Sequence, residues 1–201
     1  MDADDRWNHN LHHHPLILGA LPSPCDRVLD VGCGEGMLAR ELAGRAGEVV
    51  GLDLDEPTLE VARRDAGADN ITYLLGDLLT ADLAPGSFDA VVSVAVLHHL
   101  DEAAGLERMR DLVRPGGVVA VVGLARTRGP IDLAYDGVGF VATRVHALTK
   151  HRWETSAPKV WPPPRSYAEI RSLAERVLPG VRYRRHVLFR YSLVWTRPTD
   201  G

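Results

Sequence analysis

The stretch from Val28 to Gly36 decides the fold, and it reads Val28-Leu29-Asp30-Val31-Gly32-Cys33-Gly34-Glu35-Gly36. Its first residues have the apolar, β-branched character of a buried strand, and three alternating glycines follow. Glycine permits a tight turn and lets a ligand approach the backbone closely, and a helix is expected to open at this turn. The stretch therefore predicts a strand, a ligand-binding turn and a helix, in that order.

Alternation of the same kind continues along the chain. Apolar runs predict buried strands at residues 27–31, 48–53, 71–75, 88–94 and 118–124, with helices at residues 36–45, 57–66 and 101–113 between them. A helix at 167–177 and two closely spaced strands at 181–187 and 188–196 follow, and such a strand pair is typical of an antiparallel edge. Strand–helix alternation requires right-handed crossovers, so the rest of the sheet is expected to be parallel.

The composition is that of a globular protein, and residues 1–201 are expected to form a single domain. Apolar residues make up 45% and charged residues 25% of the chain, a balance that argues against disorder. No apolar run reaches the length of a membrane span, so no integral membrane segment is expected, and the polar, acidic start does not resemble a signal peptide. Two cysteines, Cys25 and Cys33, indicate no disulfide framework, which favours a reducing, cytoplasmic location.

The net charge of −4 is unevenly distributed along the chain. Residues 1–111 carry 8 Lys and Arg against 21 Asp and Glu, whereas residues 112–201 carry 15 against 6. The simplest interpretation is that the two halves interleave in one α/β fold and neutralise each other. The alternative is a basic side that faces the substrate.

Three details of the glycine turn indicate what it binds. The spacing is Gly-x-Gly-x-Gly, whereas Gly-x-Gly-x-x-Gly is typical of a pyrophosphate site. Asp30, at the end of the first strand, would repel an anionic dinucleotide but attract a cationic methionine ammonium. Asp53 closes the second strand, where its carboxylate can accept hydrogen bonds from ribose hydroxyls. Each carboxylate also has a purely structural interpretation, as a helix cap or the partner of an arginine.

Three further motifs complete an ordered set. They are Leu75-Gly76-Asp77-Leu78, the run across residues 88–100 that ends in Leu97-His98-His99-Leu100, and Leu112-Val113-Arg114-Pro115-Gly116-Gly117. The set resembles the class I S-adenosylmethionine-dependent methyltransferases, particularly the methyltransferase-11 or UbiE-like type, over roughly residues 28–124 and more loosely over the last two strands. The resemblance implies a Rossmann-like α/β fold: a seven-stranded, mostly parallel sheet with helices on both faces and an antiparallel C-terminal strand.

The resemblance also implies the cofactor S-adenosylmethionine, which leaves as S-adenosylhomocysteine, and a set of cofactor-binding residues. Asp30 would lie near the amino-acid end of the cofactor and Asp53 would bind the ribose. Asp77 would meet the adenine amino group, with Leu78 beside the ring, and Val94 would offer its backbone carbonyl to the methionine ammonium. The complete set is Asp30, Gly32, Cys33, Gly34, Asp53, Leu54, Asp77, Leu78 and Val94.

The acceptor side is less clearly marked. Methyl transfer is an in-line displacement, for which the protein must align an unprotonated acceptor with the methyl group. His98 and His99 follow the fourth strand, where the acceptor should arrive, and they are the candidate catalytic bases. The alternative is that they only pack and form hydrogen bonds. Neither has a carboxylate at metal-ligand spacing, so we expect no metal, and we expect a small-molecule acceptor.

Two segments are expected to cover the site. Residues 1–24 would form an N-terminal helical cap, in which Asn10, His12 or His13 is a candidate for the methionine carboxylate. Residues 126–165 would form a substrate lid with helical spacing over residues 131–148, although Gly137 and Gly139 weaken that helix. The basic residues of the lid are Arg126, Arg128, Arg144, Lys150, Arg152, Lys159 and Arg165. With Trp153 and Trp161 nearby, they are compatible with an anionic or amphiphilic acceptor, or with peripheral membrane contact through the face of residues 131–148. The simpler interpretation is a buried helix face with solvated arginines.

Other protein classes fit less well. A nicotinamide-dependent oxidoreductase shares the fold, but Asp30 and the glycine spacing argue against it. A nucleic-acid methyltransferase is expected to carry an Asn/Asp-Pro-Pro-aromatic signature after the fourth strand; this signature is lacking, so no nucleic-acid partner is expected. A non-catalytic scaffold or partner subunit with the same fold stays open, as does the choice between a monomer and a homodimer.

Overall fold

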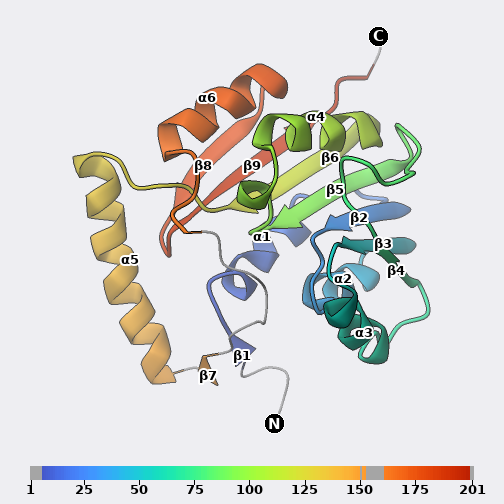
Figure 1. The fold of residues 1–201 in the computed structure, drawn as a ribbon, viewed down its shortest axis with the longest axis horizontal. Coiled ribbons are helices and arrows are strands. Elements are labelled where there is room, and N and C mark those ends of the chain that lie inside the picture. Colours follow the sequence, from blue (N-terminus) through green and yellow to red (C-terminus); the bar gives the residue numbers. More distant parts are fainter. Residues whose placement is uncertain (1–5, 150, 153–160, 200–201) are drawn as a thin grey trace.

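The computed structural model describes residues 6–149, 151–152 and 161–199. Its main sheet has seven strands in the order β4-β3-β2-β5-β6-β9-β8 (Figure 1). The strands are β2 (Arg27–Val31), β3 (Glu48–Asp53), β4 (Ile71–Leu75), β5 (Phe88–Val94), β6 (Val113–Gly123), β8 (Arg182–His186) and β9 (Arg190–Thr196). Strands β2 to β6 pair in parallel, and β9 is antiparallel to both β6 and β8. The predicted fold, a Rossmann-like sheet with an antiparallel C-terminal strand, is confirmed.

The strands β2 to β5 have the predicted bounds, but β6 begins at Val113 rather than at residue 118. Val113 is fully buried and pairs with Phe88, and a register shift then separates this pair from the regular ladder that starts at Val118. Gly116, at φ +78°, lies in the irregular part of β6 between these two pairings. The helix before β6 accordingly ends at Leu112.

Helices cover both faces of the sheet (Figure 1). On one face lie α4 (Glu102–Leu112) and α6 (Tyr167–Val177), where Met109 and Ile170 pack in one core with Leu29 of β2. On the other face lie α1 (His14–Leu18), α2 (Met37–Ala43) and α3 (Glu56–Arg64), where Ile17 and Leu59 share a core with Val28. Consecutive residues of a strand point to opposite faces, so Val28 and Leu29 belong to different cores.

Side-chain caps explain where three of these helices begin. The Asp55 carboxylate accepts from the Thr58 N–H at the start of α3, and the Asp101 carboxylate accepts from two N–H groups of α4. Ser166 and Glu169 form a reciprocal capping box on α6. Caps of this kind satisfy N–H groups that have no partner within the helix.

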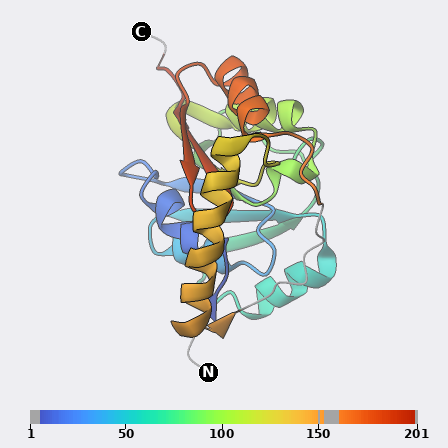
Figure 2. The ribbon, with the colours of Figure 1, turned by 90° about the vertical axis from the view of Figure 1, so that its left-hand side faces the viewer.

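Two segments lie beyond the edge at which the parallel strands end. The helix α5 (Pro130–Thr149) is continuous over 20 residues and stands apart from the sheet (Figures 1 and 2). The 3-10 helix η2 (Leu11–His13) leads into α1, and a second 3-10 helix, η3 (Leu97–His99), follows β5. Two short strands, β1 (Arg6–Trp7) and β7 (His151–Arg152), pair in parallel and join the N-terminal segment to the end of α5. Within the described ranges, no helix is long and apolar enough to cross a membrane.

Candidate functional site

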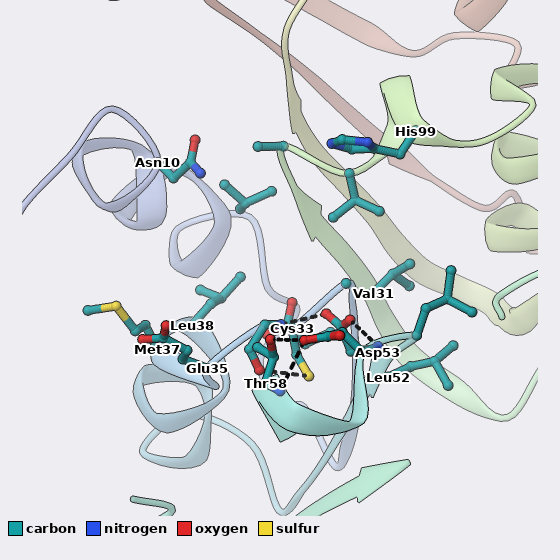
Figure 3. A pocket seen from close by; sticks show the side chains of 18 of the residues that line it. Asn10, Val31, Cys33, Glu35, Met37, Leu38, Leu52, Asp53, Thr58 and His99 are labelled. Carbon is teal, nitrogen blue, oxygen red and sulfur yellow. Dashed lines mark hydrogen bonds between the residues drawn. The ribbon is translucent and has the colours of Figure 1, made fainter. Parts of the chain in front are cut away.

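A cavity of about 320 Å³ opens at the carboxyl ends of β2, β3 and β5. Its floor is the glycine turn that follows β2, and its walls come from the N-terminal segment, the start of α3, the end of β4 and the residues after β5. In Figure 3, Cys33, Asp53 and Thr58 lie on one side of this space, and Asn10 and His99 lie on the other. Ligands of open α/β sheets bind at this edge, where neighbouring strands lead their connections to opposite faces.

Asp53 and the glycine turn hold each other in place. One carboxylate oxygen of Asp53 accepts from the Gly34 N–H at 2.8 Å, and the other accepts from the Asp55 N–H at 3.0 Å. Gly32 and Gly34 both have positive φ, and the N–H groups of Gly32 and Cys33 donate to the Leu52 carbonyl. A carboxylate oxygen can accept two hydrogen bonds and Asp53 lines the cavity, so Asp53 can accept further hydrogen bonds from a ligand.

Asp30 is a buried carboxylate that forms no ion pair within the described ranges. Its side chain is 2% exposed and lines the cavity, and its Oδ2 atom has no hydrogen-bond partner in the described part of the chain. Burial raises the pKa of Asp30 to about 7, and the negative charges of Asp53 and Glu41 add to the shift. A cationic group in the cavity would therefore find a strong and otherwise unsatisfied acceptor.

Cys33 is a small lining residue and not an activated nucleophile. Its side chain is 8% exposed, and burial raises the pKa of the thiol well above its usual value, with Asp30 and Asp53 adding to the effect. The thiol therefore stays protonated, whereas nucleophilic cysteines are thiolates.

The rim of the cavity opposite the glycine turn is formed by Asn8, Asn10 and Leu11 of the N-terminal segment and by His99 and Leu100. Asn8 organises its own segment, because its side-chain oxygen accepts from the N–H groups of Asn10 and Leu11 at 2.8 Å each. Burial lowers the pKa of His99, so the imidazole is neutral near pH 7 and can accept a proton.

Comparison with known proteins places this geometry in a family. The family described as a methyltransferase domain matches residues 28–117. An uncharacterized methyltransferase of Mycobacterium tuberculosis is 39% identical over 196 residues, which are 97% of this chain and 99% of that protein. The chain belongs to the class I S-adenosylmethionine-dependent methyltransferases.

Two further proteins that are similar to this methyltransferase have named activities. A ubiquinone biosynthesis O-methyltransferase of Mesorhizobium japonicum is 34% identical over 118 residues, which are 57% of this chain and 47% of that protein. A solved structure of a Haemonchus contortus phosphoethanolamine N-methyltransferase, in complex with phosphomonomethylethanolamine and S-adenosylhomocysteine, has a TM-score of 0.67 at 18% identity. It covers 96% of this methyltransferase and 53% of the nematode chain, and at this identity it supports the fold alone.

Most of the residues predicted from sequence line the cavity of the methyltransferase. They are Asp30, Gly32, Cys33, Gly34, Asp53, Leu54, Leu78, Val94 and His99. Asp77 is half-buried beside the cavity wall, between the lining residues Gly76 and Leu78, and its carboxylate accepts from the Leu79 N–H at 2.9 Å. His98 is 7% exposed and packs behind His99, with 4.1 Å between the ring centroids.

Of the three candidate residues predicted in the N-terminal segment, Asn10 lines the cavity, whereas His12 and His13 lie outside the lining. His14 and Thr58 also line it and were missed. His14 is 5% exposed, with its Nδ1 atom 2.8 Å from Glu41, and the run of three histidines concealed which of them faces inward.

The arginines of the segment 126–165 mainly bind the protein itself. Arg165 pairs with the buried Glu102 at 2.6 Å, and Arg128 approaches Glu169 at 3.5 Å. Lys150, Trp153 and Lys159 lie outside the described residues, and for Arg152 only the backbone pairing in β7 is described. Arg144 is exposed, and its guanidinium stacks on Phe140 of the same helix at 4.8 Å.

Proposed function

We propose that this methyltransferase transfers a methyl group from S-adenosylmethionine to a small-molecule acceptor by in-line displacement. The observation that carries the proposal is the buried, unpartnered Oδ2 atom of Asp30 at the base of a cavity whose opposite rim holds a neutral histidine, His99. A cation site at Asp30 and a proton acceptor at His99 suit methyl transfer from a sulfonium amino acid to an acceptor that must lose a proton. The cavity volume, about 320 Å³, lies in the range of small-molecule sites.

The residues of the cavity fit the cofactor from end to end. Asp30 would hold the methionine ammonium together with the Val94 carbonyl, and Asp53 would accept from the ribose hydroxyls. The backbone of Gly32, Cys33 and Gly34 would lie along the middle of the cofactor. At the adenine end, Leu54 and Leu78 would enclose the ring and Asp77 would accept from its amino group. When bound, the cofactor supplies the electrophilic methyl carbon.

His99 is proposed as the base. The bound cofactor would supply the methyl carbon and keep the electron pair of its carbon–sulfur bond, and the acceptor would supply the lone pair for the new bond. The proton of an acceptor O–H or N–H group would pass to the neutral His99 ring. His98, behind it, keeps the ring of His99 in position.

Calorimetric titration with S-adenosylhomocysteine, S-adenosylmethionine, NAD and NADP tests the cofactor assignment. We expect the two adenosyl ligands to bind and the dinucleotides not to bind. Asp53→Ala should weaken S-adenosylhomocysteine by about 10- to 100-fold, since hydrogen bonds to a charged group contribute about 1.5–3 kcal/mol. Asp69→Ala, at an exposed position outside the cavity, is the matched control and should bind like the unaltered protein.

Two results would contradict the proposal. Binding of a dinucleotide in place of the adenosyl ligands would assign the cavity to redox chemistry. Absence of binding to all four ligands would leave a scaffold or partner subunit with a methyltransferase fold. For the acceptor side, His99→Asn should retain the affinity for S-adenosylhomocysteine and lose turnover once an acceptor is found by screening.

A further inference from the structure

Four basic side chains from four different elements lie near one another between the N-terminal segment and the last strands of the sheet. They are His13 of η2, His98 of η3, His186 of β8 and Arg190 of β9, and together they are called the basic cluster here. His13 is 5% exposed, and His98 and Arg190 are 7% exposed each. The rings of His13 and His186 lie 5.5 Å apart, and both His13 and His98 lie near enough to Arg190 for its charge to disfavour their protonation.

Arg190 is a buried cation with no anionic partner among the described residues. Its terminal nitrogens donate to the Phe189 carbonyl at 3.2 Å and to Asn10 Oδ1 at 2.7 Å, both of which are neutral acceptors. Its Nε atom has no hydrogen-bond partner, and no carboxylate of the described residues forms an ion pair with it. Burial lowers the pKa of Arg190 to about 10, so the side chain keeps its charge at neutral pH. Buried charges are normally paired.

The histidines of the cluster do not add charge. Burial lowers the pKa of His13 to about 3 and that of His98 to about 4, and neighbouring positive groups contribute in both cases. The Nδ1 atom of His98 is buried and has no partner in the described part of the chain. The cluster therefore combines one fixed positive charge with a neutral imidazole nitrogen that is free to form a hydrogen bond.

The cluster adjoins the acceptor side of the cavity. In the ladder between β6 and β9, Tyr191 pairs with Gly123, so Arg190 lies at the carboxyl end of β6. β9 is two strands away from β5, a distance of roughly 10 Å at the usual strand spacing, and on the side of β5 away from Asp30 and Asp53. Two side chains connect the cluster to the cavity, because Asn10 lines the cavity and accepts from Arg190, and His99 lines it and stacks on His98.

We propose that Arg190, together with His98, binds an anionic oxygen group, a carboxylate or a phosphate, of the methyl acceptor. This inference rests on the proposed function. The guanidinium fork can hold two oxygens of such a group through Nε and one terminal nitrogen, and Asn10 gives up its contact when the group enters. The His98 Nδ1–H can donate to the same group. An acceptor anchored there extends past His99 toward the cofactor side of the cavity, so Arg190 determines which acceptors bind.

Two other roles for Arg190 make different predictions. If Arg190 served only to position Asn10, anions would not bind at Arg190. A partner for the methionine carboxylate of the cofactor would make Arg190 important for S-adenosylhomocysteine and unimportant for other anions. The position of Arg190, beyond β5 and away from the ribose end of the cavity, favours the acceptor.

The experiment uses three probes of similar size: benzoate, phenyl phosphate and the neutral benzamide. Each is titrated into the protein alone and into the protein saturated with S-adenosylhomocysteine. The variants are Arg190→Met, Arg190→Lys, and Arg182→Met on the exposed side of the neighbouring strand β8 as the control. The ¹⁵N spectrum of the arginine Nε–H groups gives a second readout on the unaltered protein, with Arg190→Lys identifying the Arg190 signal. That readout decides the question even where Arg190→Met does not fold.

We expect benzoate or phenyl phosphate to bind, to shift the Arg190 Nε–H signal, and to bind at least about tenfold more tightly than benzamide. The comparison of benzoate with phenyl phosphate distinguishes a carboxylate from a phosphate. Arg190→Met should abolish the preference, Arg190→Lys should keep part of it, and Arg182→Met should keep all of it, with the affinity for S-adenosylhomocysteine unchanged throughout.

Equal binding of benzamide and benzoate, or an unmoved Arg190 signal, would overturn the proposal. So would a loss of S-adenosylhomocysteine affinity in Arg190→Met, which assigns Arg190 to the cofactor. Failure of the unaltered protein to bind S-adenosylhomocysteine would instead concern the proposed function, since anion binding is measured without it.

Discussion

Replacing Asp30 by asparagine should stabilise the free protein and weaken its hold on the cofactor. The Asp30 carboxylate is buried, and Oδ2 has no partner in the described residues, which raises its pKa from 3.8 to about 7. A pKa higher in the folded protein than in the unfolded chain means that the folded protein binds the proton more tightly. The free energy of unfolding therefore falls as the pH rises from about 4 through about 7. A shift of about three units corresponds to about 4 kcal/mol at pH 8, and under half of that at pH 5.

The measurement is urea unfolding of the unaltered protein and of Asp30→Asn at pH 5 and at pH 8. The new amide has its own desolvation cost, about 1–3 kcal/mol, but this cost does not depend on pH. The change in unfolding free energy caused by the substitution should therefore shift in favour of the variant by about 2–3 kcal/mol between pH 5 and pH 8. At pH 8 the same variant should bind S-adenosylhomocysteine about 10- to 100-fold more weakly, because the ligand's ammonium loses a charged acceptor.

Asp69→Asn serves as the control, because its side chain is exposed. A variant at Asp30 whose stability relative to the unaltered protein is the same at both pH values would refute the reasoning. Such a result would mean that water or another hydrogen-bond donor already satisfies the Asp30 carboxylate in the free protein.

Three further substitutions or titrations test the geometry of the site and of the sheet. Gly32 has φ +67°, and a Cβ atom added there would overlap the Val96 side chain. Gly32→Ala should therefore lower the free energy of unfolding in urea by roughly 2–4 kcal/mol and abolish calorimetric binding of S-adenosylhomocysteine. The Asp89 carboxylate pairs with Arg114 and accepts from two N–H groups at the start of β2. Asp89→Asn should therefore lower the free energy of unfolding by about 1–3 kcal/mol at pH 7, and this loss should shrink as the pH falls below about 4. In NMR titrations His98 should stay neutral down to about pH 5, because its pKa is lowered to about 4, and this pKa should rise in Arg190→Met.

The parts of the fold that depend on local patterns were predictable. The strands β2, β3 and β5 are buried runs bounded by turn residues, and helix α6 begins at a capping box. The predicted burial of residues 71–75 is wrong, because β4 lies at the edge of the sheet and buries only Tyr73. Helix α5 shows the limit of such reasoning, because Gly137 and Gly139 weaken its local preference. The helix is nevertheless continuous, and Gly139 lies against the Leu188 backbone and the Phe189 ring, where a Cβ atom would be crowded. A tertiary contact there outweighs helix propensity.

In the site too, residues in local motifs could be predicted, and residues brought together by the topology could not. Asp30, Gly34 and Asp53 could be predicted because each stands at the end of a strand in a recognisable motif. Arg190 could not, because its role follows from the pairing of β9 beside β6 and from Asn10, which is 180 residues away in the sequence. No motif marks either residue, and only the topology brings them together.

Asp30 and Arg190 have opposite charges and share one physical feature. Each is buried, each has an atom that forms no hydrogen bond in the described residues, and each has a pKa shifted toward its neutral form by burial. A fold selected only for stability would pair or replace such groups, because unpaired buried charges cost free energy. A bound ligand of opposite charge removes that cost. Ligand binding at Asp30 in the cavity should therefore need a cation, and binding at Arg190 beside the cavity should need an anion. On this proposal, charge distinguishes the cofactor from the acceptor.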